Sequence, residues 1–116
     1  MAGFYIEETP QGGTAIFAEC ANTKKRAVLI GHFDKEQTRF APEDRIDRGC
    51  AGPTGLDTFV PHTFRLLIRY GCFELYLDDL LVQTYLCDGM PTGRIQLALQ
   101  NCACRLENVK VYEMNL

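Results

Sequence analysis

The sequence predicts an all-β fold in which two antiparallel sheets pack against each other as a β-sandwich. Short runs of alternating apolar and polar residues recur along the chain, and clusters of Gly, Pro, Asn and Asp separate them. The only segment that could hold a helix, residues 34–58, has a poor helical pattern. This combination is typical of sandwiches and barrels. Because each predicted strand has one apolar face, we favour two packed sheets over a barrel.

The predicted fold is organised around a three-stranded meander, residues 62–86. Tyr70-Gly71 and Asp78-Asp79 are expected to form its two turns, with Gly71 supplying the positive φ of the first. These turns place Leu75 between Leu66 and Val82, where it should be among the most buried residues. One face of the meander is then almost wholly apolar and carries Phe64, Leu66, Ile68, Phe73, Leu75, Leu77, Leu80 and Val82. A slip of one residue would reverse every side chain, so this register is strongly specified.

Further strands are predicted on both sides of the meander. Those before it are Phe4–Glu8, Thr14–Ala21, Arg26–Phe33 and a short strand at either Thr38–Ala41 or Arg45–Asp47. Those after it are Gly93–Gln100 and Ala103–Tyr112. In the last segment the apolar positions change phase, which predicts a β-bulge near Glu107-Asn108.

Length and composition limit the functional classes. The 116 residues are 47% apolar and 23% charged, which predicts one domain, residues 1–116, with its own core. A net charge of −3 argues against a nucleic-acid-binding protein, which would need a basic face. No apolar run approaches the roughly 20 residues of a membrane-spanning helix, and we expect no membrane partner.

The six cysteines are expected to be reduced thiols. An even number permits disulfides, but there is no CxxC motif, and Cys102 and Cys104 would share one strand face. This interpretation favours a cytoplasmic location. His32 and His62 lie far apart in the sequence with no second ligand near either. We therefore predict no metal site and no cofactor.

An enzymatic activity finds little support in the sequence. Glu74 and Asp78 share a strand face, but four residues along a strand span about 13 Å. The two carboxylates of a glycosidase lie roughly 5–9.5 Å apart. No nucleophile, zinc-protease or phosphate-binding motif is present. No catalytic residue is predicted.

The polar face of the meander is the candidate binding surface. Its side chains could hydrogen-bond hydroxyl groups while an aromatic ring stacks on a sugar. The predicted ligand-binding residues are Arg65, Arg69, Glu74, Tyr76, Gln83 and Tyr85. Two other interpretations remain open. The face is either simply solvated, with an Arg–Glu pair of small energetic value, or it is partly covered by another domain or subunit, because Leu67, Cys72 and Leu81 also lie on it.

The second half of the chain resembles the closing strands of concanavalin A-like jelly-roll domains. The segments that carry the resemblance are FRLLIRYGCFELYLDDLLVQTY, TGRIQLALQN and LENVKVYEM. They are most similar to laminin-G-like modules and to the C-terminal β-sandwiches of invertase-type glycoside hydrolases. The matching positions are Arg69, Glu74, Tyr76, Asp78, Thr92, Gly93, Ile95, Leu97, Val109, Lys110, Val111 and Tyr112.

The resemblance implies a jelly roll that is missing some N-terminal strands and forms the C-terminal part of a longer protein. The acidic catalytic strand of the related glucanases has no counterpart. It therefore implies a non-catalytic accessory module of a carbohydrate-active enzyme, with a glycan, a catalytic domain or a second copy as partner. The alternatives are a protein–protein or oligomerisation module without sugar affinity, and a small independent glycosidase.

Overall fold

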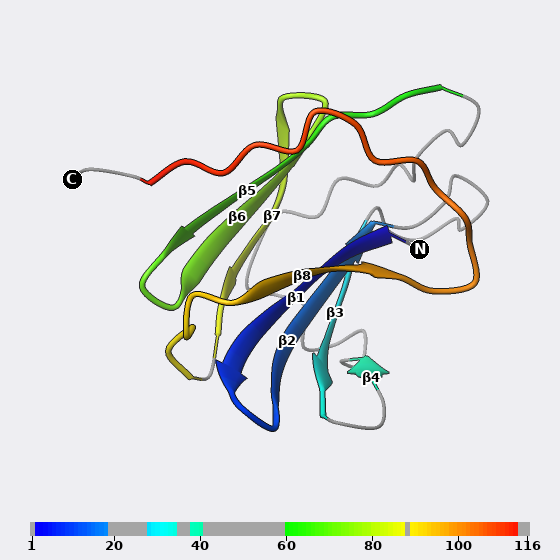
Figure 1. Ribbon diagram of the computed structural model, residues 1–116. Coiled ribbons are helices and arrows are strands. Elements are labelled where there is room, and N and C mark those ends of the chain that lie inside the picture. Colours follow the sequence, from blue (N-terminus) through cyan, green and yellow to red (C-terminus); the bar gives the residue numbers. More distant parts are fainter. Residues whose placement is uncertain (1, 19–27, 35–37, 41–59, 88, 114–116) are drawn as a thin grey trace.

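The computed structural model describes residues 2–18, 28–34, 38–40, 60–87 and 89–113 (Figure 1). Within these ranges the chain forms eight strands and no helix, so the predicted all-β class is confirmed. The strands are β1 (Ala2–Thr9), β2 (Gly12–Ala18), β3 (Val28–Phe33), β4 (Thr38–Phe40), β5 (Phe64–Arg69), β6 (Cys72–Leu77), β7 (Leu80–Leu86) and β8 (Ile95–Leu99). The alternative strand at Arg45–Asp47 lies outside the described residues.

The strands form two antiparallel sheets. The first has the order β4-β3-β2-β1-β8 and the second is the meander β5-β6-β7. In the β1–β2 hairpin the Gln11 amide donates to the Thr9 hydroxyl at 3.2 Å. A side chain at Gly13 would collide with the carbonyl oxygen of Ile6 on the partner strand, so glycine is required there.

The meander pairs through the two predicted turns. Phe64, Leu66 and Ile68 face Leu77, Leu75 and Phe73, in agreement with the predicted register of β5 and β6. The turn residues Asp78 and Asp79 have φ values of 51° and 65°. In the first turn the prediction for Gly71 is wrong, because Tyr70 adopts the left-handed conformation instead, with φ of 54°.

A β-bulge changes the predicted register of β7. Leu75 pairs with Gln83 and the next residue, Tyr76, pairs with Leu81, so Val82 is the extra residue on β7. Beyond this bulge every side chain of β7 lies on the face opposite to the predicted one. Gln83 and Tyr85 therefore point into the core, and the prediction that they belong to the polar face is wrong.

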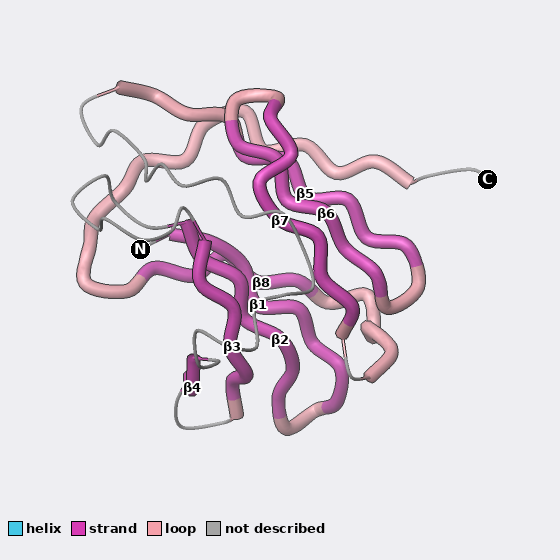
Figure 2. Tube along the Cα trace, turned by 180° about the vertical axis from the view of Figure 1, so that it is seen from behind, coloured by secondary structure: helices cyan, strands magenta, loops and turns pink. Residues whose placement is uncertain are grey.

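The two sheets enclose one hydrophobic core. The two views show them as separate layers that face each other (Figures 1 and 2). The first sheet contributes Ile6, Ile16, Ala18, Val28 and Ile30 to this core, and the meander and the residue after it contribute Phe73, Leu75, Leu77, Val82, Tyr85 and Cys87. Burying each large apolar side chain contributes roughly 1.5–3 kcal/mol. Leu80, predicted to be buried, is instead exposed at the start of β7, next to the second turn.

The opposite face of the five-stranded sheet carries a second, smaller cluster. Ala15, Phe17 and Ala98 are buried there, and Tyr5 and Phe33 pack against them. The Tyr5 ring stacks on Phe33 with centroids 4.5 Å apart and meets Phe17 edge-on at 5.7 Å. Both faces of the central strands β1 and β2 therefore carry apolar side chains.

The predicted last strand, Ala103–Tyr112, does not form. Residues 100–113 follow β8 as an extended segment without strand pairing (Figure 1). Its apolar side chains Leu106, Val109, Val111 and Tyr112 are exposed. Alternation of apolar and polar side chains is not sufficient for a strand, because its backbone N–H and C=O groups also need a neighbouring strand to pair with.

The cysteines that the structure describes are reduced thiols, as predicted for them. Cys87 lies in the core, whereas Cys72, Cys102 and Cys104 are exposed. Cys20 and Cys50 lie outside the described residues.

Candidate functional site

The solvent side of the meander is a three-by-three array of side chains, which we call the outer face. Cross-strand pairing fixes its three rows, because directly paired residues share one side of a sheet. The rows are Arg65–Tyr76–Leu81, Leu67–Glu74–Thr84 and Arg69–Cys72–Leu86. Of the six residues predicted to bind a ligand, four lie here: Arg65, Arg69, Glu74 and Tyr76.

Three of these residues are in contact with one another. The Tyr76 hydroxyl donates a hydrogen bond to Glu74 Oε2 at 2.7 Å. The Arg65 guanidinium lies over the Tyr76 ring, with its carbon 4.3 Å from the ring centroid. This is within the range of a cation–π contact. Neighbouring strands β5 and β6 thus hold a cation, a ring and a carboxylate in one fixed group.

The electrostatics of this group keep Tyr76 protonated. The hydrogen bond to Glu74 raises the pKa of the Tyr76 phenol, and partial burial and the charge of Glu74 act in the same direction. The positive charge of Arg65 opposes these effects. The phenol therefore remains a hydrogen-bond donor at neutral pH, and its acceptor is already provided by Glu74.

Arg69 lies apart from this group, in the third row. Its guanidinium is 5.9 Å from the centroid of Tyr70, which is exposed in the first turn. Next to it on β6 is the exposed thiol of Cys72. Arg69 is therefore available at the surface, but it does not contact the group formed by Arg65, Tyr76 and Glu74.

Gln83 and Tyr85 lie in the core, on the other side of the meander. Tyr85 packs against Phe73 with ring centroids 5.4 Å apart. Gln83 is fully buried, and its side-chain amide donates to the Thr84 carbonyl at 2.8 Å. Its Oε1 atom accepts no hydrogen bond from any residue that the structure describes. Because of the bulge, Thr84 and Leu86 take the positions on the outer face that the sequence pattern assigned to Gln83 and Tyr85.

Asp78, which the sequence pattern places on one strand face with Glu74, is held in the second turn by the segment that precedes β5. His62 Nδ1 lies 2.6 Å from Asp78 Oδ2, and the Thr63 amide donates to Asp78 Oδ1 at 2.9 Å. The hydrogen bond with His62, followed by that from Thr63, lowers the pKa of the Asp78 carboxyl. Both carboxylate oxygens thus accept hydrogen bonds, and they fix the second turn against the start of β5.

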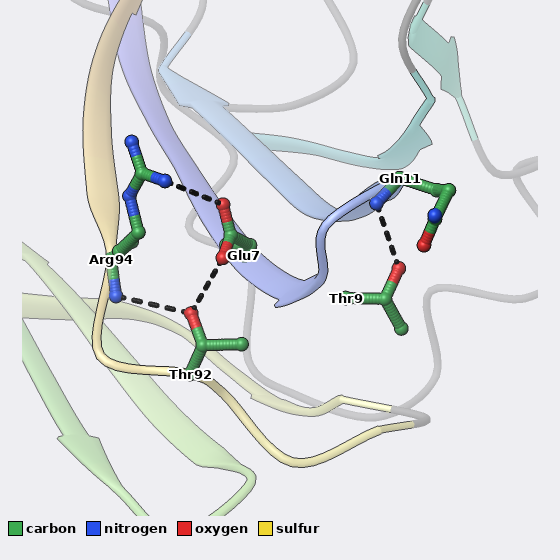
Figure 3. A network of polar contacts seen from close by, with 5 residues as sticks. All are labelled: Glu7, Thr9, Gln11, Thr92 and Arg94. Atoms are coloured by element: carbon green, nitrogen blue, oxygen red, sulfur yellow. Dashed lines mark hydrogen bonds and ion pairs between the residues drawn. The ribbon is translucent and has the colours of Figure 1, made fainter.

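A second polar group, which the sequence patterns did not reveal, fastens the segment before β8 to β1 (Figure 3). Glu7 Oε1 accepts a hydrogen bond from the Thr92 hydroxyl at 3.0 Å, and its Oε2 lies 3.8 Å from Arg94 Nη1. The neighbouring Glu8 accepts a hydrogen bond from the Gly89 amide at 2.7 Å. These contacts span more than 80 positions in the sequence, so no local pattern could predict them. They position the entry to β8.

The residues that the structure describes hold no cluster of three His, Cys, Asp or Glu side chains arranged to bind a metal ion. In the same part of the chain, no helix is long and apolar enough to cross a membrane.

Comparison with known proteins finds no matching family model, no similar curated protein and no similar solved structure.

Proposed function

We propose that the protein is a non-catalytic accessory β-sandwich module of a carbohydrate-active enzyme that contacts a glycan through its outer face. The sequence resemblance of the second half of the chain to concanavalin A-like jelly rolls supports this proposal. So does the two-sheet sandwich, which presents a broad meander face to solvent. A flat face suits contact along one side of an extended chain better than enclosure of a small molecule.

The contact group formed by Arg65, Glu74 and Tyr76 is the observation that carries the proposal. Arg65 offers several N–H donors, and Glu74 has a carboxylate oxygen beyond the one bound to Tyr76. Both can hydrogen-bond sugar hydroxyls. Because Arg65 already covers the Tyr76 ring at 4.3 Å, stacking of a sugar on that side of the ring would first require Arg65 to move. Tyr76 is thus expected to position its neighbours more than to stack.

A glycan array followed by calorimetry tests this proposal. Arg65→Ala should weaken binding of the best glycan about tenfold, the effect expected when a hydrogen bond to a charged group worth roughly 1.5 kcal/mol is lost. Tyr76→Phe keeps the ring under Arg65 but frees Glu74, so it should change affinity without changing Tm appreciably. Arg94→Ala, just before β8 and away from the outer face, removes the same charge and is the matched control. If the wild-type protein binds no glycan, or if Arg65→Ala and Arg94→Ala behave alike, the glycan proposal is wrong.

A second candidate function is a protein–protein module that uses the same face. The observation that favours it is the apolar border of the outer face, where Leu81 and Leu86 on β7 are 42% and 55% exposed. Exposed apolar patches rimmed by polar residues mark protein–protein interaction sites. A negative glycan array, together with binding of the dye ANS that Leu81→Lys and Leu86→Lys abolish, would favour this function over the first.

A further inference from the structure

The two sheets of the sandwich have unequal widths, and the wider one overhangs the narrower. The edge strand β5 of the meander lies over β1, because the rings of Phe4 and Phe64 are in contact with centroids 6.5 Å apart. In the first sheet, β8 lies one strand beyond β1. Among the strands that the structure describes, none of the meander lies opposite β8, so a further strand at the outer edge of β5 would occupy this position.

This missing strand leaves apolar side chains of β8 uncovered. Ile95 and Leu97 pair directly with Ile6 and Phe4, whose side chains belong to or pack on the core, so they lie on the core side of the sheet. Leu99 has the same orientation. Nevertheless Ile95, Leu97 and Leu99 are 47%, 49% and 48% exposed, whereas Ile6 is fully buried. Three consecutive core-side positions thus face an open edge.

The segment after β8 has the properties of the missing strand. Arg105 and Glu107 form an ion pair at 3.0 Å, as residues on one side of an extended chain can. Asn108 has a φ of 55°, the left-handed conformation that shifts alternation by one residue in a bulge. With this shift Leu106, Val109 and Val111 lie on one side of residues 103–112. All three are exposed, and Val111 is 92% exposed.

We propose that residues 103–112 of one copy add to the free edge of β5 in a second copy, so that two chains exchange these segments in a symmetric dimer. Backbone groups on the side of β5 where no described strand is its neighbour would be paired. Leu106, Val109 and Val111 would cover Ile95, Leu97 and Leu99 of the other chain. A twofold axis makes both contacts at once, which is the usual symmetry of homodimers.

The direction of the segment favours a second copy over the segment's own chain. Figures 1 and 2 show residues 103–113 running toward the same side of the molecule as β5. Pairing within one chain would therefore be parallel, whereas every pair of strands in the described sheets is antiparallel. A twofold axis perpendicular to β5 reverses the direction of the incoming segment and makes the pairing antiparallel.

Light scattering coupled to size exclusion tests the exchange with the full chain. The wild-type protein should dimerise in a concentration-dependent manner, and Val109→Lys combined with Val111→Lys should raise the dimer dissociation constant at least tenfold. Both valines are exposed, so this variant should fold normally by circular dichroism. Leu80→Lys, which replaces an exposed leucine at the start of β7, the other edge strand of the meander, is the matched control and should leave the dimer intact. A wild-type protein that stays monomeric at millimolar concentration overturns the proposal, as does a dimer that the valine variant retains.

A mixing experiment separates exchange from pairing within one chain. The valine variant has a defective segment but an intact edge, and Leu97→Lys has the reverse. Each alone should be monomeric, and an equimolar mixture should form a heterodimer through the one intact pair of segment and edge. If the mixture stays monomeric although Leu97→Lys is folded, the exchange proposal is wrong.

Discussion

The bulge in β7 makes a sharp prediction about two neighbouring residues. In the bulged register Tyr85 lies in the core and Leu86 lies on the outer face. In a register without the bulge the two would change places, with Leu86 buried and Tyr85 in solvent. Replacing each by alanine therefore tests the register directly, because the two registers assign the larger loss of stability to different residues.

The expected magnitudes follow from burial. Tyr85 is 8% exposed and packs on Phe73, so Tyr85→Ala removes a buried ring and should cost about 3–5 kcal/mol, as for other aromatic core truncations. Leu86 is 55% exposed, so Leu86→Ala should cost roughly 1 kcal/mol or less. A difference of several kcal/mol is a large share of the roughly 5–15 kcal/mol that stabilise a small domain.

Urea denaturation followed by tyrosine fluorescence or circular dichroism measures this difference. With an m value of about 2 kcal/mol per molar urea, the two midpoints should differ by roughly 1–2 M. If Tyr85→Ala is too unstable to measure, Tyr85→Leu keeps apolar volume and should still be less stable than Leu86→Ala. A larger loss for Leu86→Ala than for Tyr85→Ala would refute the bulged register and return Gln83 and Tyr85 to the outer face.

Three further predictions concern the core, the second turn and the thiols. Leu75→Ala should cost about 2–5 kcal/mol in the same urea assay, whereas Glu74→Ala, on the other face, should cost roughly 0.5 kcal/mol at most; comparable losses would contradict the face assignment. The lowered pKa of Asp78 means that its carboxylate stabilises the fold above its ordinary pKa of about 4, a contribution that is lost as the pH falls through the lowered value. The Tm of Asp78→Asn should therefore lie below that of the wild type near pH 6 and approach it as the pH falls below the ordinary pKa of a carboxyl group, and a constant difference would contradict this. A thiol assay on denatured, non-reduced protein should titrate most of the six cysteines, an outcome that three disulfides would exclude.

The strands could be predicted from the sequence where an alternating segment pairs with the next segment along the chain. In the hairpin of β5 and β6, a two-residue turn fixes the pairing and alternation fixes the face, so the register followed from adjacent residues. In the β6–β7 hairpin, the predicted register holds only for the residue pairs next to the turn. Val82 and Gln83 are both buried, because the bulge turns two consecutive side chains toward the core. Simple alternation without a bulge assigns Gln83 to the polar face.

The candidate site was correspondingly predictable in part. Arg65, Glu74 and Tyr76 lie on β5 and β6, before the bulge, and the structure brings them into contact. Which of them would touch could not be read from alternation, because the contact depends on side-chain rotamers. The fastening of Glu7 to Thr92 was also beyond prediction, because it joins segments that meet only after the two ends of the chain have come together.

The outer face and the proposed exchange share strand β5, and this connects the two proposals. In the phase set by Asn108, the residues of the segment that would point away from the core include Lys110 and Tyr112. Added at the edge of β5, they would lie beside Arg65 and Arg69 and widen the outer face by one strand. Any ligand that contacts both strands would then bind the dimer more tightly than the monomer and, by linkage, would strengthen dimerisation by the same factor. Glycan affinity should therefore be compared above and below the dimer dissociation constant. If the affinity is the same at protein concentrations above and below this constant, the ligand contacts only the outer face of a single copy.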